Sequence, residues 1–319
     1  MQEAITELSG FLPFQMIRGN EGNALAWCDF RDVPLEAPFF IRDIVRRAFL
    51  PNPKFVTTPL ETLLEIGPSL NGLQPDGFIF HMSACGSTLL ANMLRAVPGN
   101  LSLGEPNVLY DLLALSRVEN RLDVVKLFRG GVNALGQKRL GIEEHYVIKF
   151  GSAMTLFLPL IIEAFPDVPR VFLYRDPVEV LVSNMRMPTQ EWLFEAEVTG
   201  LDSEVMTERN TALENCALAL QRSIQAFINY GLGNHLIANY SQFSPSLLER
   251  ILNLFNLSAT PTEIERMLAV RKNHAHGRET LFEPDADKKQ RLASARLRAV
   301  AREYLQEDYT RLEAMRVRL

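Results

Sequence analysis

Residues 77–94 read GFIFHMSACGSTLLANML, and this stretch decides the fold. The apolar run from Gly77 to Met82 has the length and composition of a buried parallel strand. A turn of small residues follows, and the sequence from Ser87 to Val97 has the composition of a helix. A strand joined to a helix by a tight turn is the repeating unit of α/β proteins, so we predict a parallel sheet with helices on both faces.

The rest of the chain continues this alternation of strands and helices. We predict further strands at 101–103, 146–150, 171–174 and 235–239, and helices at 155–165, from 177, around 213–227, from 245, from 261 and along 287–318. In such a sheet the crossovers are right-handed, and ligands bind beyond the carboxyl ends of the strands. The junctions that follow the strands are therefore the places to search for chemistry.

The leading part of the chain has a different pattern. An Asn- and Gly-rich turn between short apolar runs predicts a hairpin. We predict two strands and two helices here, at 14–17, 24–30, 39–50 and 59–66. Residues 67–76 are rich in Gly, Pro and Asn and mark a boundary. We therefore expect residues 1–70 to form a small α+β extension packed on an α/β domain of residues 71–319.

The charge balance limits the kinds of partner. The 319 residues include 33 Lys and Arg against 38 Asp and Glu, a formal net charge of −5, which argues against a protein that coats nucleic acid or an anionic membrane. The three cysteines lie far apart without metal-binding spacing, as is typical of a reducing compartment. The N-terminus carries acids where a secretory signal carries basic residues, and the apolar run 154–165 is too short to span a bilayer. We expect a cytoplasmic protein with a small-molecule partner. The sequence leaves open whether the protein forms a homodimer.

The turn after the first strand is a candidate anion site. It consists of Ser83, Ala84, Cys85, Gly86, Ser87 and Thr88. Gly86 permits a tight turn, and the free N–H groups and dipole at a helix start favour an anion. The alternative is an ordinary strand–turn–helix junction capped by serine. No lysine follows Gly86, so the signature G-x-x-x-x-G-K-[ST] is absent, which disfavours an ATP-dependent phosphotransferase.

The second junction, YRDPVEVLVS at 174–183, places an arginine directly after an apolar strand. Asp176 and Pro177 are explained as a helix start. Arg175 is not explained in that way, and its guanidinium can bind a phosphate with two parallel hydrogen bonds. Ser183 follows eight residues later, about two helical turns, and so can face the same side as the helix start.

These two segments, HMSACGSTLLANML and YRDPVEVLVSNMRMP, together resemble the sulfotransferase family, over about residues 77–185 and more like its bacterial members. The resemblance implies a P-loop NTPase-like fold and sulfuryl transfer from 3′-phosphoadenosine 5′-phosphosulfate to a hydroxyl or amine, leaving adenosine 3′,5′-bisphosphate, with no metal required. It implies that residues 83–88 bind the 5′-phosphosulfate and that Arg175 and Ser183 bind the 3′-phosphate. A late basic loop adds Arg278 to this site, with Arg271 and Lys272 as further candidates.

One position departs from that family pattern. The family usually has Lys or Arg two residues before the loop glycine, where this sequence has Ala84. That cation neutralises charge on the oxygen that leaves with the phosphate, and chemistry of this kind depends on positioning and charge stabilisation. We take Lys149, at the end of the third predicted strand of the sheet, as the substitute; the alternative is a structural lysine whose stem is buried. A non-catalytic nucleotide- or phosphate-binding protein on the same scaffold is the alternative function.

The candidate bases are Glu105 and His81. A carboxylate at the end of the second strand of the sheet can accept the proton of an acceptor hydroxyl or amine. The resemblance gives this role to Glu105, although a glutamate before a proline also opens helices in solvent. His81 ends the first strand of the sheet and is the rival base, or a structural histidine. Tyr240 and Asn239, at the end of the last strand, are expected to shape the acceptor pocket.

Overall fold

The computed structural model describes residues 7–19, 22–70, 72–117, 120–186, 211–270 and 285–318, without the side chain of residue 122. Its main sheet has five strands in the order β5-β6-β4-β7-β8, and every neighbouring pair is parallel. These strands are β4 (Gly77–His81), β5 (Asn100–Gly104), β6 (His145–Lys149), β7 (Arg170–Tyr174) and β8 (His235–Asn239). They are buried almost throughout, as parallel strands covered on both faces must be. The predicted α/β class is confirmed.

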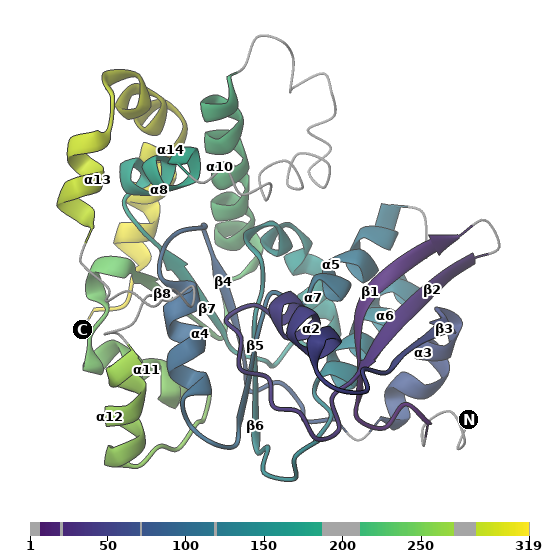
Figure 1. Cartoon of the computed structure of the whole chain (residues 1–319). Coiled ribbons are helices and arrows are strands. Elements are labelled where there is room, and N and C mark those ends of the chain that lie inside the picture. Colours follow the sequence, from purple (N-terminus) through teal and green to yellow (C-terminus); the bar gives the residue numbers. More distant parts are fainter. Residues whose placement is uncertain are drawn as a thin grey trace.

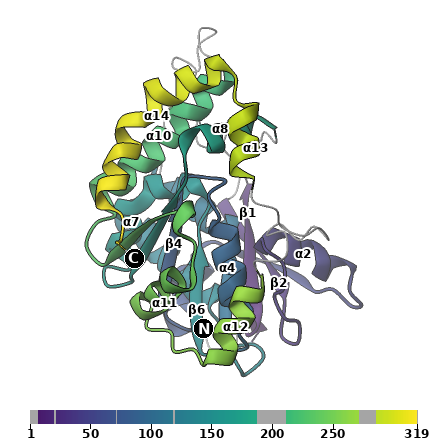
Figure 2. The same cartoon turned by 90° about the vertical axis from the view of Figure 1, so that its left-hand side faces the viewer.

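Helices cover both faces of this sheet. Their bounds are α4 (Ser87–Arg95), α5 (Asn107–Ala114), α6 (Arg121–Leu135), α7 (Leu158–Ala164), α8 (Pro177–Arg186), α10 (Ala212–Tyr230), α11 (Pro245–Leu254), α12 (Pro261–Ala269), α13 (Ala286–Leu292) and α14 (Ala295–Met315). Figure 1 shows the sheet edge-on, with α4, α11 and α12 on one side and α5, α6 and α7 on the other. Figure 2 shows that α8 and α13 lie together at the opposite end of the molecule from α11 and α12. No helix among the described ranges is both long and apolar enough to cross a membrane.

The leading part of the chain forms its own sheet, which packs on α5 and α6. Its antiparallel strands are β1 (Phe11–Gly19), β2 (Gly22–Asp29) and β3 (Phe55–Pro59), with helices α2 (Phe40–Phe49) and α3 (Glu61–Ile66). The prediction missed β3 and began the following helix at residue 59 instead of Glu61. Strand β3 is largely exposed, so its sequence has no buried face to reveal it, and it pairs with β2 at a distance along the chain.

Further elements differ from the prediction, two of them for clear physical reasons. Helix α6 was missed because Gly130 and Gly131 disfavour a helix in an isolated sequence. In the fold these glycines permit close packing: a Cβ on Gly131 would lie 2.7 Å from a methyl carbon of Leu112 on α5. The long helix predicted at 287–318 is two helices, α13 and α14. The break occurs at Ser294, whose hydroxyl caps α14 by accepting the N–H of Leu297 at 3.2 Å.

Candidate functional site

The strand order brings the predicted site residues to one edge of the sheet. Strand β4 lies between β6 and β7, so the turn that follows it lies between Lys149, at the end of β6, and Arg175, after β7. Glu105 follows β5 on one flank and Tyr240 follows β8 on the other. Because parallel strands end at the same edge, four separate junctions converge there.

The turn after β4 has a strained backbone. Ser83, Ala84 and Gly86 have φ angles of 57°, 43° and 87°, in the left-handed region that residues other than glycine seldom adopt. Such strain persists only where the surroundings hold the chain. Here the Ser83 hydroxyl donates to Asn184 on α8 at 3.1 Å, and the Cys85 thiol donates to the Leu173 carbonyl on β7 at 3.1 Å.

His81 also holds this turn. Its Nδ1 accepts the N–H of Ser83 at 3.0 Å, and its Nε2 lies 3.0 Å from the Phe150 carbonyl oxygen, an arrangement that fits a neutral ring protonated on Nε2. Burial keeps the pKa of His81 well below its usual value, and the nearby Lys149 ammonium lowers the pKa further. Both ring nitrogens are therefore used in positioning the turn, and neither has a free lone pair for a substrate proton.

One aromatic ring connects the turn to Arg175. A Cβ at residue 86 would lie 2.6 Å from the ring of Tyr240, and the Arg175 guanidinium carbon lies 4.3 Å from the centre of that ring. Gly86 is thus required both by its φ angle and by this close approach. Tyr240 was expected at the acceptor pocket. The structure places it beside Arg175 instead, and Asn239 donates hydrogen bonds to Tyr309 and Glu313.

Two carboxylates hold the Arg175 side chain. Its Nε lies 2.5 Å from Glu179 Oε2, and its Nη2 lies 2.7 Å from Asp285 Oδ1, at the start of α13. The other oxygen of Asp285 lies 2.9 Å from Lys289 Nζ. Burial raises the pKa of Asp285, but the hydrogen bonds from Lys289 and Arg175 outweigh burial and hold this pKa below its usual value. The Ser183 hydroxyl donates to the Glu179 carbonyl at 2.9 Å.

An ion pair occupies the other flank. The ammonium of Lys149, whose side chain is 1% exposed, donates to the carboxylate of Glu105, which is 17% exposed. Glu105 has a φ angle of 51°, and its N–H donates to the Lys149 carbonyl at 2.7 Å. The remaining non-glycine residues with positive φ in the described ranges are Asn52 and Asn256, of a type that tolerates it. Strain in other residue types thus coincides with the predicted site.

A cavity of about 370 Å³ opens beside Glu105. Apolar groups form most of its wall, and Asp111 on α5 is its second carboxylate. Among the residues that the structure describes, neither lysine nor arginine lines it. The N-terminal sheet and α2 contribute one side. Its lining residues are Phe14, Gln15, Ile41, Glu105, Pro106, Asn107, Tyr110, Asp111, Phe150, Gly151, Ser152, Ala153 and Met154.

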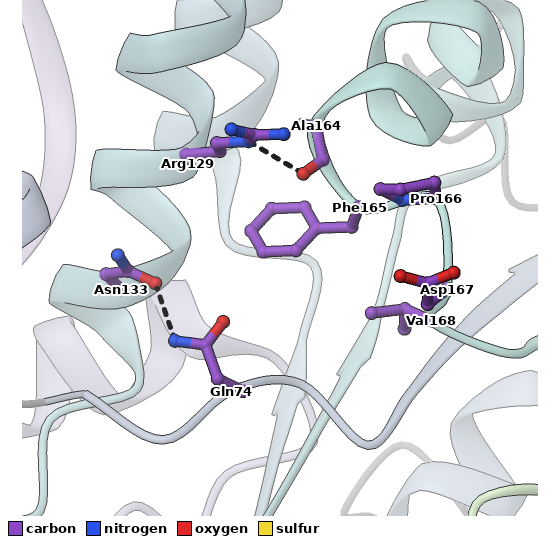
Figure 3. Close-up of a pocket in the computed structure, with 8 residues that line it drawn as sticks. All are labelled: Gln74, Arg129, Asn133, Ala164, Phe165, Pro166, Asp167 and Val168. Carbon is purple, nitrogen blue, oxygen red and sulfur yellow. Dashed lines mark hydrogen bonds between the residues drawn. The ribbon is translucent and has the colours of Figure 1, made fainter.

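A second cavity of similar volume, about 360 Å³, lies at the opposite edge of the sheet (Figure 3). Gln74 and Val168, which precede β4 and β7, line it. Two hydrogen bonds join groups of its wall: Arg129 Nε donates to the Ala164 carbonyl at 2.7 Å, and Gln74 donates to Asn133 at 3.5 Å (Figure 3). We assign this cavity no chemistry.

The structure therefore brings together residues 83–88, Glu105, Lys149, Arg175, Ser183 and His81. Arg271, Lys272 and Arg278 lie outside the described residues. Sequence reasoning missed Asp285, Lys289 and Asp111; an aspartate within the otherwise apolar helix α5 was the available signal for Asp111. Among the described residues, no group of three or more His, Cys, Asp or Glu side chains is arranged to hold a metal.

No family model matches this chain, and no curated protein matches it. Among solved structures it is similar to the sulfotransferase domain from the curacin biosynthetic pathway (TM-score 0.47, 16% identity, 73% of this chain and 98% of that one). It is also similar to sulfotransferase STF9 from Mycobacterium avium (0.47, 13%, 78% and 81%) and to mouse sulfotransferase SULT7A1 complexed with PAP (0.40, 10%, 80% and 92%). These identities leave the chemistry to be argued from the residues of the site.

Proposed function

We propose that the protein is a sulfotransferase, which transfers a sulfuryl group from 3′-phosphoadenosine 5′-phosphosulfate to a hydroxyl or amine. The observation that carries the proposal is the shared edge: a strained turn that opens a helix and a buried arginine lie against the same Tyr240 ring. One element suits the 5′-phosphosulfate and the other the 3′-phosphate. The carboxylate of Glu105 lies on the far flank, where an acceptor can enter.

In this proposal the nucleotide is bound by main-chain N–H groups and by two cations, Arg175 and Lys289. The N–H groups at the start of α4, with the hydroxyls of Ser87 and Thr88, bind the 5′ side. Arg175 and Ser183 bind the 3′-phosphate, the role that the family resemblance implies for them. We further propose that this phosphate replaces the carboxylate of Asp285, which now lies between Arg175 and Lys289.

Transfer is a single in-line displacement. The acceptor oxygen forms a bond to sulfur while the bond from sulfur to the bridging phosphate oxygen breaks. The proton of the acceptor hydroxyl passes to Glu105, and adenosine 3′,5′-bisphosphate leaves. Lys149 supplies the positive charge that Ala84 lacks, because it ends β6, the strand beside β4 and its turn. Burial raises the pKa of the Cys85 thiol in that turn, and the Lys149 ammonium acts against the rise. His81 is a positioning residue in this scheme.

The test is a calorimetric titration with adenosine 3′,5′-bisphosphate and with adenosine 5′-monophosphate. The wild-type protein should prefer the bisphosphate, and Arg175→Ala should abolish that preference. Because removing Arg175 leaves Glu179 without its partner, Arg175→Lys serves as a milder variant, and Arg250→Ala, an exposed arginine on α11, is the control. Equal affinity of the wild-type protein for both nucleotides contradicts the proposal. So does an absence of sulfated product across hydroxyl and amine acceptors, since that result supports binding without catalysis.

A further inference from the structure

The cavity beside Glu105 has a composition that selects among acceptors. Its apolar wall includes Phe14, Ile41, Phe150 and Met154, and its volume of about 370 Å³ is at the lower end of the range for small-molecule sites. Such a wall favours a compact apolar or aromatic body, because burying that surface contributes most of the binding free energy. The polar groups of the wall then decide which substituents the body can carry.

Asp111 is the polar group that stands out. It lies in the helix NVLYDLLA, half-buried, and its Oδ2 accepts one hydrogen bond, from the N–H of Met16 at 3.2 Å. Burial raises the pKa of Asp111, with the Met16 N–H and the charge of Arg18 acting against that rise. Desolvation thus penalises the ionised carboxylate, and a bound cation would relieve that penalty.

The charged groups of the cavity wall also favour a cationic ligand. Of its two carboxylates, Glu105 is paired with Lys149, whereas no lysine or arginine of the described chain lines the cavity to pair with Asp111. An anionic acceptor would add a like charge to this wall, and a neutral one would leave the charge of Asp111 to the Met16 N–H and to Arg18. A cationic acceptor is the complementary one.

We propose that this cavity is the acceptor site and that it selects a compact, apolar amine: Asp111 binds the ammonium group while Glu105 faces the hydroxyl that receives the sulfuryl group. The inference rests on the proposed function and names its acceptor class. It also gives the N-terminal sheet and α2 a role, since Phe14, Gln15 and Ile41 form one side of the site.

The test uses three phenols that differ in one substituent: tyramine (cationic), 4-ethylphenol (neutral) and 4-hydroxyphenylacetate (anionic). Calorimetry measures their affinities for the wild-type protein, Asp111→Asn, Asp111→Glu and Asp167→Asn. Asp167 is the matched control, because it is the carboxylate that lines the second cavity (Figure 3). We expect the Kd of tyramine to be at least about tenfold lower than that of 4-hydroxyphenylacetate, as a charge-assisted hydrogen bond implies. Asp111→Asn should remove this preference, whereas Asp111→Glu and Asp167→Asn should keep it.

Binding is measured without donor nucleotide, so the result does not depend on catalysis. If adenosine 3′,5′-bisphosphate fails to bind but the preference for tyramine depends on Asp111, the sulfotransferase proposal fails and the amine site stands. If sulfuryl transfer occurs but the preference is absent or survives in Asp111→Asn, the amine site is overturned and the sulfotransferase proposal stands. Loss of the preference in Asp167→Asn instead would place the ligand at the opposite edge and also overturn the inference. Thermal unfolding of each variant establishes that it is folded.

Discussion

Replacing Asp285 with asparagine should tighten the binding of adenosine 3′,5′-bisphosphate. The carboxylate lies 2.7 Å from Arg175 and 2.9 Å from Lys289, between the two cations that we assign to the 3′-phosphate. A phosphate that takes this place must displace the carboxylate or bind beside its negative charge. Asparagine keeps the shape of the side chain and removes the charge.

The expected gain follows from the geometry of Asp285. Two unit charges 4 Å apart attract by about 1 kcal/mol in water and about 4 kcal/mol near a protein surface. The Asp285 side chain is 35% exposed, so solvent screening brings each of its two ion pairs toward the lower figure. We expect about 1–2 kcal/mol in favour of the bisphosphate, which corresponds to a Kd roughly 5- to 30-fold lower.

Calorimetry at several salt concentrations measures this effect, and the gain should shrink as salt is raised. Adenosine 5′-monophosphate should gain little, because it lacks the 3′-phosphate. Asp287→Asn, an exposed carboxylate two residues away on α13, should change neither affinity. If Asp285→Asn leaves the Kd of the bisphosphate unchanged or raises it, or if the monophosphate gains equally, the placement of the 3′-phosphate between Arg175 and Lys289 is refuted.

Three other predictions concern buried groups at or near the site. Burial raises the pKa of Cys85 to about 11, so only about one thiol in a thousand is ionised at pH 8; peptide mapping should show no reaction of the folded protein with iodoacetamide, and rapid labelling would contradict this. The pKa of His81 is lowered in the fold, so below about pH 6.5 the unfolded chain takes up a proton that the fold excludes. This group should therefore lower the free energy of unfolding by up to about 1.4 kcal/mol for each unit by which pH falls below about 6.5. Urea titrations of His81→Gln should show a smaller loss of stability as pH is lowered. Burial raises the pKa of Asp111, so its destabilising effect develops as pH rises past about 4 and is complete above the folded-state pKa. Asp111→Asn should therefore raise Tm at pH 7, and a lower Tm would show that the carboxylate stabilises the fold.

Local patterns predicted the centre of the fold well. The run from Gly77 to Met82, the small-residue turn and the following helix are set by neighbouring residues, and the structure has them in that order. The missed elements depend on distant contacts. Helix α6 requires the packing that Gly130 and Gly131 permit, and β3 requires pairing with β2. Propensity alone disfavours the first and does not reveal the second.

The same distinction applies to the site. The rule that ligands bind beyond the carboxyl ends of parallel strands was enough to bring Gly86, Lys149 and Arg175 together. The partner of Arg175 was not predictable, because Asp285 lies 110 residues further along the chain and reaches the arginine through the packing of α13 on α8. The residues of the cavity wall were not predictable for a similar reason, because the N-terminal sheet is adjacent to Glu105 in the fold but not along the chain.

The most direct measurement is a crystal structure of the protein with adenosine 3′,5′-bisphosphate. We expect the 5′-phosphate on the main-chain N–H groups at Gly86, Ser87 and Thr88, and the 3′-phosphate on the Arg175 guanidinium, with the carboxylate of Asp285 moved away. A bisphosphate bound elsewhere, or bound with the contact between Arg175 and Asp285 intact and no phosphate on the guanidinium, would contradict it.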